Sequence, residues 1–185
     1  MLKALIFDLD NTLVFAEKAN YLAYKEACDR YGFKINEQNL YKAIREAQRW
    51  DEFLPSLTGT NDLAVLEKIV EAKKELYPKY FGFIIPNESL FQLIEFAQGK
   101  LKTCVATSAS RVNAENVLKN FKLIEKIDVL IMGDDVSKAK PDPEIFLKAA
   151  ELLGVKPEEC LVFEDADNGV AAARAAGMHC VKIAF

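Results

Sequence analysis

Two aspartates placed two residues apart near the N-terminus are the first side chains that suggest chemistry. Asp8 and Asp10 follow a short apolar run at 5–7, and a strand followed by a turn would bring both carboxylates to one site beyond the edge of a sheet. Carboxylates held close together repel each other unless a cation or a shared proton lies between them. Because Mg²⁺ prefers hard oxygen ligands, the pair predicts a magnesium site. Taken alone, the pair is equally consistent with an acidic turn.

Three more polar clusters follow apolar runs later in the chain. They are Thr107 and Ser108 after the run at 104–106, Lys140 after the run at 129–132, and Glu164 and Asp165 after the run at 161–163. If these runs are parallel strands, their carboxyl ends share one edge of the sheet, where ligands bind in open α/β sheets. We therefore expect all of these side chains to converge with Asp8 and Asp10 on one crevice.

The elements that must position these side chains are visible as continuous apolar runs. The runs lie at 5–7, 104–106, 129–132, 161–163 and 180–183. Continuous rather than alternating runs are typical of strands buried on both faces of a parallel sheet. Segments with helical spacing alternate with them, at 87–98, 111–121, 142–153 and 169–176. This alternation predicts the α/β class, with a doubly wound, Rossmann-like parallel sheet and right-handed crossovers.

The segment 16–85 has a different pattern, in which apolar and aromatic residues recur at helical intervals. The expected helices span 17–31, 37–53 and 63–77, with interruptions at Pro55, Gly59 and Pro78. We predict a small helical cap domain here, inserted after the first strand, and an α/β catalytic core formed by 1–15 and 86–185. Because ligands bind beyond the carboxyl end of that strand, the insertion is well placed to act as a lid.

The composition narrows the class of protein and of partner. The chain has 185 residues, a formal net charge of −4, and 51% hydrophobic and 28% charged residues, which is too apolar for a disordered chain. The mild negative charge gives no basis for binding nucleic acid or an anionic membrane. No apolar run approaches the roughly 18 residues of a membrane span. We expect a cytoplasmic protein that is a monomer or a weak dimer.

The cysteines point to the same compartment. Cys28, Cys104, Cys160 and Cys180 are widely spaced and include no Cys-x-x-Cys pair. Three of them lie in apolar runs, so we interpret them as small buried hydrophobic residues rather than as disulfides or zinc ligands. Unpaired thiols favour a reducing compartment.

Four motifs in the α/β part occur together in a characteristic order. They are DLDNTL at 8–13, VATS at 105–108, KPDPEIF at 140–146 and FEDADNGV at 163–170. This set resembles the haloacid dehalogenase-like hydrolase superfamily, and most closely its phosphatase and β-phosphoglucomutase-like branch. The resemblance implies a Mg²⁺-dependent phosphatase that hydrolyses a small phosphorylated metabolite through an aspartyl-phosphate intermediate.

The resemblance also implies a role for each catalytic and phosphate-binding side chain. Asp8 would be the nucleophile, and Asp10 would be the general acid that protonates the leaving oxygen and then activates the hydrolytic water. Thr107 would donate a hydrogen bond to the transferring phosphoryl group, with Ser108 helping through its backbone amide. Lys140 would neutralise phosphate charge and help to hold Asp8.

For the metal, the resemblance implies three ligands and one supporting residue. Mg²⁺ would be held by the carboxylates of Asp8 and Asp165 and by the backbone carbonyl of Asp10. Glu164 would lie behind these ligands or add one more to them.

Each of these roles has a structural alternative. Thr107 and Ser108 would cap the following helix. Lys140 would be a surface lysine, with Lys138 as the rival for its role. The acidic pair at 164–165 would form a turn before the next helix.

Two positions depart from the family pattern. Asn11 stands where many relatives carry Gly in a tight turn, and Asn tolerates left-handed geometry better than most residues. Asn20 aligns with a His that phosphoglucomutase-type members use in proton transfer, and an amide is neither acid nor base at neutral pH. This favours hydrolysis over sugar-phosphate mutase chemistry, which stays an alternative beside a non-catalytic binding protein of the same fold. The only histidine, His179, lies on the last predicted strand, where we interpret it as structural.

The resemblance implies that the cap sets substrate choice. We interpret its many aromatic residues mainly as the core of a small helical bundle, with an aromatic substrate pocket as the alternative. Arg45 and Arg49 lie four residues apart on one predicted helix face. They would clamp an anionic group of the substrate or form a solvated basic face with Lys42.

Overall fold

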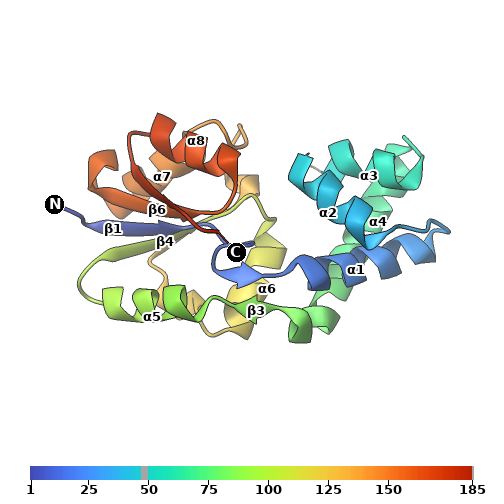
Figure 1. The fold of residues 1–185 in the computed structure, drawn as a ribbon, viewed down its shortest axis with the longest axis horizontal. Helices are drawn as coiled ribbons and strands as arrows, with labels where there is room; N and C mark the ends of the chain where they lie inside the picture. The colour runs from blue at the N-terminus through green and yellow to red at the C-terminus, as the bar shows by residue number, and fades with distance from the viewer. Residues whose placement is uncertain (47–49, 185) are drawn as a thin grey trace. The chain divides into compact units, whose positions relative to one another are not determined.

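The computed structural model describes the backbone of residues 1–46 and 50–184, and the side chains of these residues other than 45 and 46. The chain divides into two compact units, each of which is described by itself. One combines Met1–Phe15 with Ile85–Phe185, and the other is Ala16–Ile84. The first unit contains the strands, and the second is helical (Figure 1).

The first unit is built on a five-stranded parallel sheet with β1 at its centre. The strands are β1 (Ala4–Phe7), β4 (Lys102–Ala106), β5 (Val129–Ile131), β6 (Cys160–Glu164) and β7 (His179–Lys182). Their order is β5-β4-β1-β6-β7, and every neighbouring pair is parallel. The chain therefore proceeds outward from β1 in both directions, which confirms the predicted doubly wound α/β fold.

Helices cover both faces of this sheet. They are α5 (Glu88–Ala97) and α6 (Arg111–Asn120) on one face, and α7 (Glu144–Leu153) and α8 (Asp167–Ala175) on the other (Figure 1). Asp142 accepts the N–H of Glu144 at 3.0 Å where α7 begins, and Gly154, with φ 67°, ends it. Because the strand order reverses direction at β1, the carboxyl ends of β1 and its neighbours lie where open α/β sheets bind ligands.

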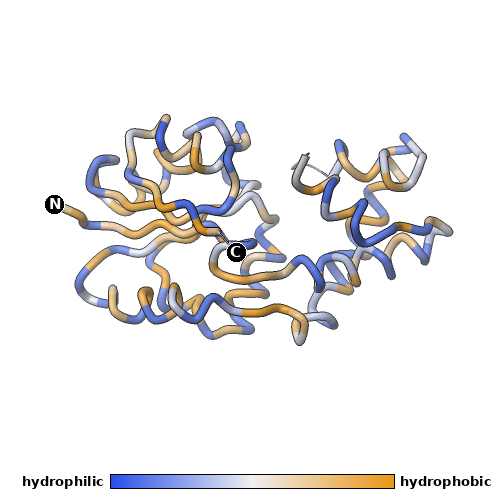
Figure 2. Tube along the Cα trace, in the orientation of Figure 1, coloured by the Kyte–Doolittle hydropathy of each residue, from blue (hydrophilic) through white to orange (hydrophobic). Residues whose placement is uncertain are grey.

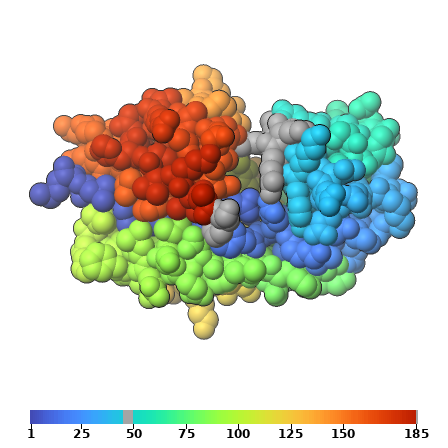
Figure 3. Space-filling model, in the orientation of Figure 1, coloured from blue at the N-terminus to red at the C-terminus, as the bar shows by residue number. Residues whose placement is uncertain are grey.

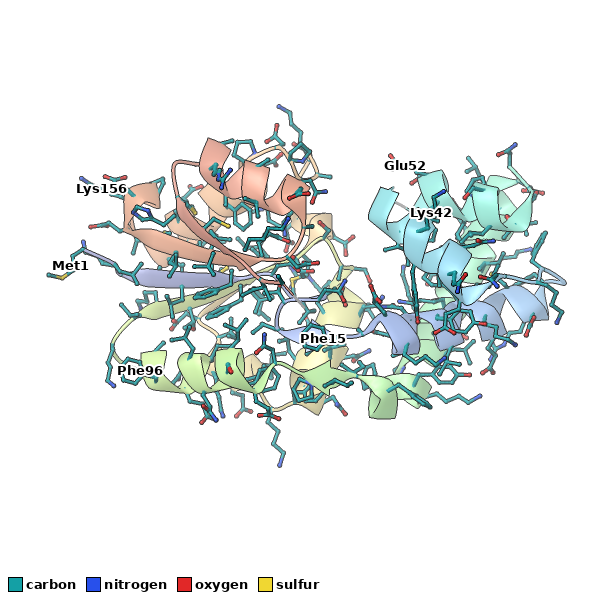
Figure 4. The ribbon with its side chains drawn as sticks, viewed as in Figure 1. Met1, Phe15, Lys42, Glu52, Phe96 and Lys156 are labelled. Carbon is teal, nitrogen blue, oxygen red and sulfur yellow. The ribbon has the colours of Figure 1, made fainter. Side chains whose placement is uncertain are left out.

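Strand β1 is buried along its whole length and separates two layers of core. Ile6 points toward α7 and α8, where it joins Phe146 in one hydrophobic cluster. Phe7 points to the opposite face, because successive strand residues alternate, and it stacks on Phe163 with ring centroids 5.0 Å apart. Figure 2 shows these apolar strands in orange, and Figure 4 shows side chains filling the space between sheet and helices.

A short antiparallel ribbon carries the two chain connections to the helical unit. In it, β2 (Val14–Phe15) pairs with β3 (Ile85–Pro86). Next to the ribbon, Asn87 donates its side-chain N–H to the backbone carbonyl of Thr12 at 3.1 Å. The start of α5 is thereby tied to the turn that follows Asp10.

Within its described residues, the second unit consists of helices joined by short turns. They are α1 (Glu17–Arg30), α2 (Glu37–Glu46), α3 (Trp50–Thr58), α4 (Leu63–Leu76) and the 3-10 segment η1 (Tyr77–Phe83). Asp62 caps α4 by accepting the N–H groups of Ala64 and Val65. Pro78 lies just beyond the end of α4, as the sequence predicts.

The structure differs from the sequence prediction at Pro55, which is expected to interrupt the helical pattern. The described parts of the predicted helix 37–53 are helical in α2 and at the start of α3, residues 47–49 lie outside the described residues, and Pro55 lies inside α3. Proline removes one hydrogen bond and crowds the carbonyl four residues earlier. That carbonyl belongs to Asp51 in the first turn of α3, so the disturbance is confined to the start of the helix.

The aromatic residues of the helical unit are less buried than the sequence interpretation expects. Tyr24 packs edge-to-face on Phe53 with centroids 5.6 Å apart, and the buried Lys73 Nζ lies 4.0 Å from the ring centroid of Tyr77. These three aromatic rings are buried, whereas Tyr31 and Phe83 are exposed. The expectation is wrong for most of the set, because a small bundle has little interior and tyrosine hydroxyls seek polar partners at its surface.

The structure bears on the expected state of the cysteines and on the expected lack of a membrane-spanning segment. The four cysteines are free thiols. Cys28, Cys104 and Cys160 are buried, which confirms their interpretation as small buried residues, whereas Cys180 is partly exposed and the interpretation is wrong for it. Within the described chain, no helix combines the length and the apolar character needed to cross a membrane.

The central position of β1 leads to a stability prediction. We expect Ile6→Ala to lower the free energy of unfolding by about 2–5 kcal/mol, because it leaves a cavity beside a fully buried strand. Val181→Ala lies on the edge strand β7, which reaches the surface in Figure 3, and its side chain is 42% exposed. This control should cost less than about 1 kcal/mol. Urea denaturation followed by circular dichroism measures both, and equal losses would contradict the assignment of β1 as the centre of the core.

Candidate functional site

The carboxyl ends of three adjacent strands bring polar side chains to one edge of the sheet. Asp8 directly follows β1, Thr107 directly follows β4, and Glu164 is the last residue of β6. Strand β1 pairs with both neighbours, with Phe7 opposite Val105 and Phe163. Since all three strands are parallel and in this register, the polar residues at their carboxyl ends are neighbours at one edge of the sheet.

A buried lysine joins all three of these strand ends. Nζ of Lys140 donates to Oδ1 of Asp8 at 2.7 Å, to Oε2 of Glu164 at 2.7 Å and to the backbone carbonyl of Ala106 at 3.2 Å. An ammonium group has three N–H donors, so each has an acceptor. The rival Lys138 is 70% exposed and pairs with Asp142 at 3.4 Å. The structure thus places Lys140, and not Lys138, at the strand ends.

The charges of this cluster do not balance. Asp8, Glu164 and Asp165 offer carboxylate oxygens that all lie within 4.8 Å of one another. The ammonium group of Lys140 pairs with two of these three carboxylates, Asp8 and Glu164, so an excess of negative charge remains in the cluster when all three are ionised. A divalent cation held by oxygen ligands would offset this excess. The donor set therefore fits the metal that the sequence predicts.

The excess of negative charge in this cluster affects the pKa values of its members. Burial, and then the charge of Glu164, raise the pKa of Asp8 well above its usual range, although Lys140 acts in the opposite direction. Burial and the same glutamate raise the pKa of Asp165 to about 6. Burial disfavours the charged form of Lys140, but Asp8 and Glu164 outweigh it and raise the pKa of the ammonium group. Lys140 therefore stays charged beside carboxylates that burial makes reluctant to ionise.

A tight turn after β1 places Asp10 and connects to Asp165. Asn11 has φ 60°, which is the left-handed geometry expected at a tight-turn position where many relatives carry Gly. The turn closes through N–H groups of Leu13 and Val14, which donate to the carbonyl of Leu9 at 3.0 Å. The buried Thr12 donates its hydroxyl to Oδ1 of Asp165 at 3.3 Å. Asp10 is partly exposed within this turn.

The segment after β4 has Thr107 buried and Ser108 exposed. The hydroxyl oxygen of Thr107 accepts the N–H of Ala109 at 3.1 Å, which leaves the hydroxyl proton available for another acceptor. The N-cap residue of α6 is Ser110. Thr107 and Ser108 thus precede the cap, and the structure does not bear out the alternative that they cap this helix.

The sequence analysis missed Gly169, which makes room for Glu164. A Cβ atom at Gly169 would lie 2.1 Å from both Cδ and Oε2 of Glu164. The glutamate is also held by the N–H of Ala166, which donates to Oε1 at 3.1 Å, and it is 2% exposed. It is therefore no solvated acidic turn. A glycine within a helix costs about 1 kcal/mol relative to alanine, and this anomaly in FEDADNGV was the signal available.

The remaining candidate residues lie outside the strand-end cluster. His179 begins β7 and is exposed, and Asn20 lies in α1, partly exposed. The side chains of Arg45 and Arg49 fall outside the described residues, so the structure does not bear on the predicted clamp.

We expect Gly169→Ala to push the carboxylate of Glu164 away from Lys140 and to destabilise the α/β unit. Overpacking of this kind costs about 1–3 kcal/mol. Gly82→Ala is the matched control, because a Cβ atom there meets nothing within 4 Å. Thermal denaturation compares the two. A Tm for Gly169→Ala equal to that of the control would rule out a tight fit of Glu164 against α8.

Comparison with known proteins gives a consistent assignment. A family model described as haloacid dehalogenase-like hydrolase matches residues 2–177. The phosphorylated carbohydrates phosphatase of Thermotoga maritima is 33% identical over 182 residues, which cover 96% of this chain and 82% of that relative. The fructose-1-phosphate phosphatase of Escherichia coli is 30% identical over 190 residues, which cover 97% and 95% of the two chains.

A solved structure matches the whole fold. The crystal structure of CbbY from Rhodobacter sphaeroides in complex with phosphate superposes with a TM-score of 0.88 at 26% identity. The match covers 100% of this chain and 87% of that one.

Proposed function

Because the chain belongs to the haloacid dehalogenase-like hydrolase family, we propose that it is a Mg²⁺-dependent phosphatase that hydrolyses a small phosphomonoester through an aspartyl-phosphate on Asp8. The observation that carries this proposal is the buried cluster in which Lys140 holds Asp8 and Glu164. Phosphoryl transfer depends mainly on positioning and on charge stabilisation. A carboxylate fixed in this way at the end of a central strand is suited to attack phosphorus.

The names of the relatives support a phosphorylated carbohydrate as the substrate class. One is named for phosphorylated carbohydrates and another for fructose 1-phosphate. We therefore place sugar monophosphates first among the small phosphorylated metabolites that the site would accept.

In the first step, Oδ2 of Asp8 attacks the phosphorus atom while the bond from phosphorus to the leaving oxygen breaks. Lys140 donates to Oδ1 at 2.7 Å, which orients the carboxylate and leaves Oδ2 for the attack. Asp10 transfers its proton to the leaving oxygen, so the alcohol departs neutral. The hydroxyl of Thr107 and the N–H of Ser108 bind the phosphoryl oxygens as the group moves to Asp8.

In the second step, a water molecule gives a proton to Asp10 while its oxygen attacks phosphorus. The bond from phosphorus to Asp8 breaks, which returns the carboxylate and releases inorganic phosphate. Lys140 favours this departure because it stabilises the negative charge that reappears on Asp8. The sum of both steps is one phosphomonoester and one water converted to one alcohol and one phosphate.

The metal-binding residues are assigned from the carboxylate cluster. Bound to Asp8, Asp165 and the backbone carbonyl of Asp10, Mg²⁺ would supply positive charge that neutralises the phosphoryl oxygens. Both oxygens of Glu164 have partners, Lys140 at 2.7 Å and the N–H of Ala166 at 3.1 Å. We therefore assign Glu164 to holding Lys140 rather than to binding the metal.

We assign catalysis to the α/β unit and substrate selection to the helical unit, as a cap. Every proposed catalytic and metal-binding residue lies in 1–15 or 86–185. The helical unit is inserted directly after the turn that contains Asp10, and both of its connections leave from the β2–β3 ribbon. Asn20 on α1 offers an amide where a mutase would need an acid or base, which supports hydrolysis.

The first test measures phosphate release from sugar monophosphates, phosphoglycolate, nucleotides and an aryl phosphate, with Mg²⁺ or with EDTA. We expect release with Mg²⁺, none with EDTA, and a loss of at least about 10³-fold for Asp8→Asn, which lacks the nucleophile. Asp167→Asn is the control, since this aspartate is 92% exposed and pairs with Lys182. Release that persists in Asp8→Asn would refute the covalent mechanism. Isomerisation of a sugar phosphate without release would identify a mutase.

The second test separates the two steps through Asp10→Asn. An aryl leaving group needs little protonation, so this variant should still form the aspartyl-phosphate but should hydrolyse it slowly. We expect a burst of about one aryl alcohol per enzyme, followed by slow turnover. A sugar phosphate should show no burst, because its alcohol leaves poorly without a proton. Equal losses on both substrates without a burst would argue against Asp10 as the acid and base.

A further inference from the structure

The turn after β5 contacts the segment that carries Thr107 and Ser108. This turn is the 3-10 segment η3 (Gly133–Asp135). The N–H of Gly133 donates to the carbonyl of Ala109 at 3.2 Å. The carboxylate of Asp134 accepts the backbone N–H of Arg111 at 2.9 Å, which supplies a cap that Ser110, the N-cap residue of α6, does not make with its own side chain.

An ion pair between Arg111 and Asp135 also joins the turn to the start of α6. The guanidinium group of Arg111 donates from one nitrogen to both carboxylate oxygens of Asp135, at 2.6 and 2.7 Å. Asp135 is itself held, because it accepts the N–H of Met132 at 2.9 Å and its carbonyl accepts Nζ of Lys148 on α7 at 2.6 Å. Charge-assisted bonds of this kind are about twice as strong as neutral ones. The turn is thus anchored to α7 and in turn anchors the start of α6.

The glycine of the turn packs directly on the phosphate-binding segment. A Cβ atom at Gly133 would lie 2.6 Å from the backbone oxygen of Ser108 and 3.2 Å from its carbonyl carbon. That carbonyl belongs to the same peptide group as the N–H of Ala109, which donates to the hydroxyl of Thr107. A displaced Ser108 carbonyl would tilt this peptide group and release the Thr107 hydroxyl from its orientation.

We propose that the Gly133–Asp135 turn and Arg111 form a clamp that sets the position of Thr107 and of the Ser108 amide for binding the transferring phosphoryl group. Gly133, Asp135 and Arg111 are positioning residues in this assignment, which rests on the proposed phosphatase function. The clamp acts through the backbone of 107–111, so its loss changes the alignment of two donors without removing either of them. A misplacement of about 1 Å lowers the rate by roughly 100-fold.

A direct contact between Arg111 and the substrate is the competing explanation, since this side chain is 45% exposed. The two explanations differ in what Asp135 does. If Arg111 acts through the clamp, Asp135→Ala reproduces Arg111→Ala, and the double variant is no worse than either single one. If Arg111 binds substrate, Arg111→Ala raises KM, and Asp135→Ala does not reproduce the effect.

The experiment measures kcat and KM on the best substrate of the panel for wild type, Gly133→Ala, Arg111→Ala, Arg111→Lys, Asp135→Ala and the double variant. We expect kcat to fall by roughly 10- to 100-fold while KM changes less than about threefold. Arg111→Lys keeps a charged donor and should recover part of the loss. Lys126→Ala is the control, because it removes an exposed ion pair to Glu95 on α5, a different helix from the one that the clamp holds.

A structural readout runs beside the kinetics. Hydrogen exchange of the Ala109 amide, followed by NMR, should be faster by at least about 10-fold in Gly133→Ala and Arg111→Ala, because the local opening becomes easier. Faster exchange with unchanged kcat would overturn the positioning role, and unchanged exchange would overturn the clamp itself. A wild type without phosphatase activity would refute the proposed function, whereas an active wild type with unaffected variants would refute only the clamp.

Discussion

One ammonium group between two carboxylates, in the interior of the α/β unit, is the interaction on which the site depends. Lys140 satisfies Asp8, Glu164 and the carbonyl of Ala106 at once, and it is almost completely buried. Removing one partner of such a pair costs about 3–5 kcal/mol, because the other charge is left buried and unpaired. The position of the proposed nucleophile is therefore coupled to the stability of the unit. Moving the Asp8 carboxylate away from Lys140 would lower the free energy of unfolding.

The rest of the unit meets the geometric demands of that interaction. Strand β1 must lie between β4 and β6, because the partners of Lys140 come from the ends of all three strands. Glu164 must come close to the first turn of α8, which only a glycine at 169 allows. The turn at 9–14 must bring Thr12 to Asp165 across the same edge. The order of the strands, the glycine at 169 and the left-handed Asn11 thus all support one arrangement of charges.

The difference between what the sequence predicts and what it misses follows from the range of the interactions. The strands and the residues that end them are local features, since a continuous apolar run and the polar residue after it lie together in the chain. Gly133 and Gly169 matter because backbone or a carboxylate from another element lies within 3 Å of where their Cβ would be. A glycine in a helical segment, as at Gly169, marks an unusual position, but no local pattern identifies the neighbour that requires it. Glu164 shows the same limit: its place after β6 is evident, but its pairing with Lys140 depends on the fold.

The charges of the site also explain why alignment of neutral donors is important here. A phosphomonoester brings negative charge to a cluster that already has an excess of it. The N–H donors of Lys140 already have acceptors in Asp8, Glu164 and Ala106, so this lysine makes the local electrostatic potential less negative but has no donor to spare for the substrate. In the proposed mechanism, the phosphoryl oxygens then rely on a bound cation and on donors such as the Thr107 hydroxyl and the Ser108 amide. Dipoles stabilise a transition state when they are oriented in advance. The proposed clamp meets this requirement, because the turn at 133–135 holds the backbone of 107–111.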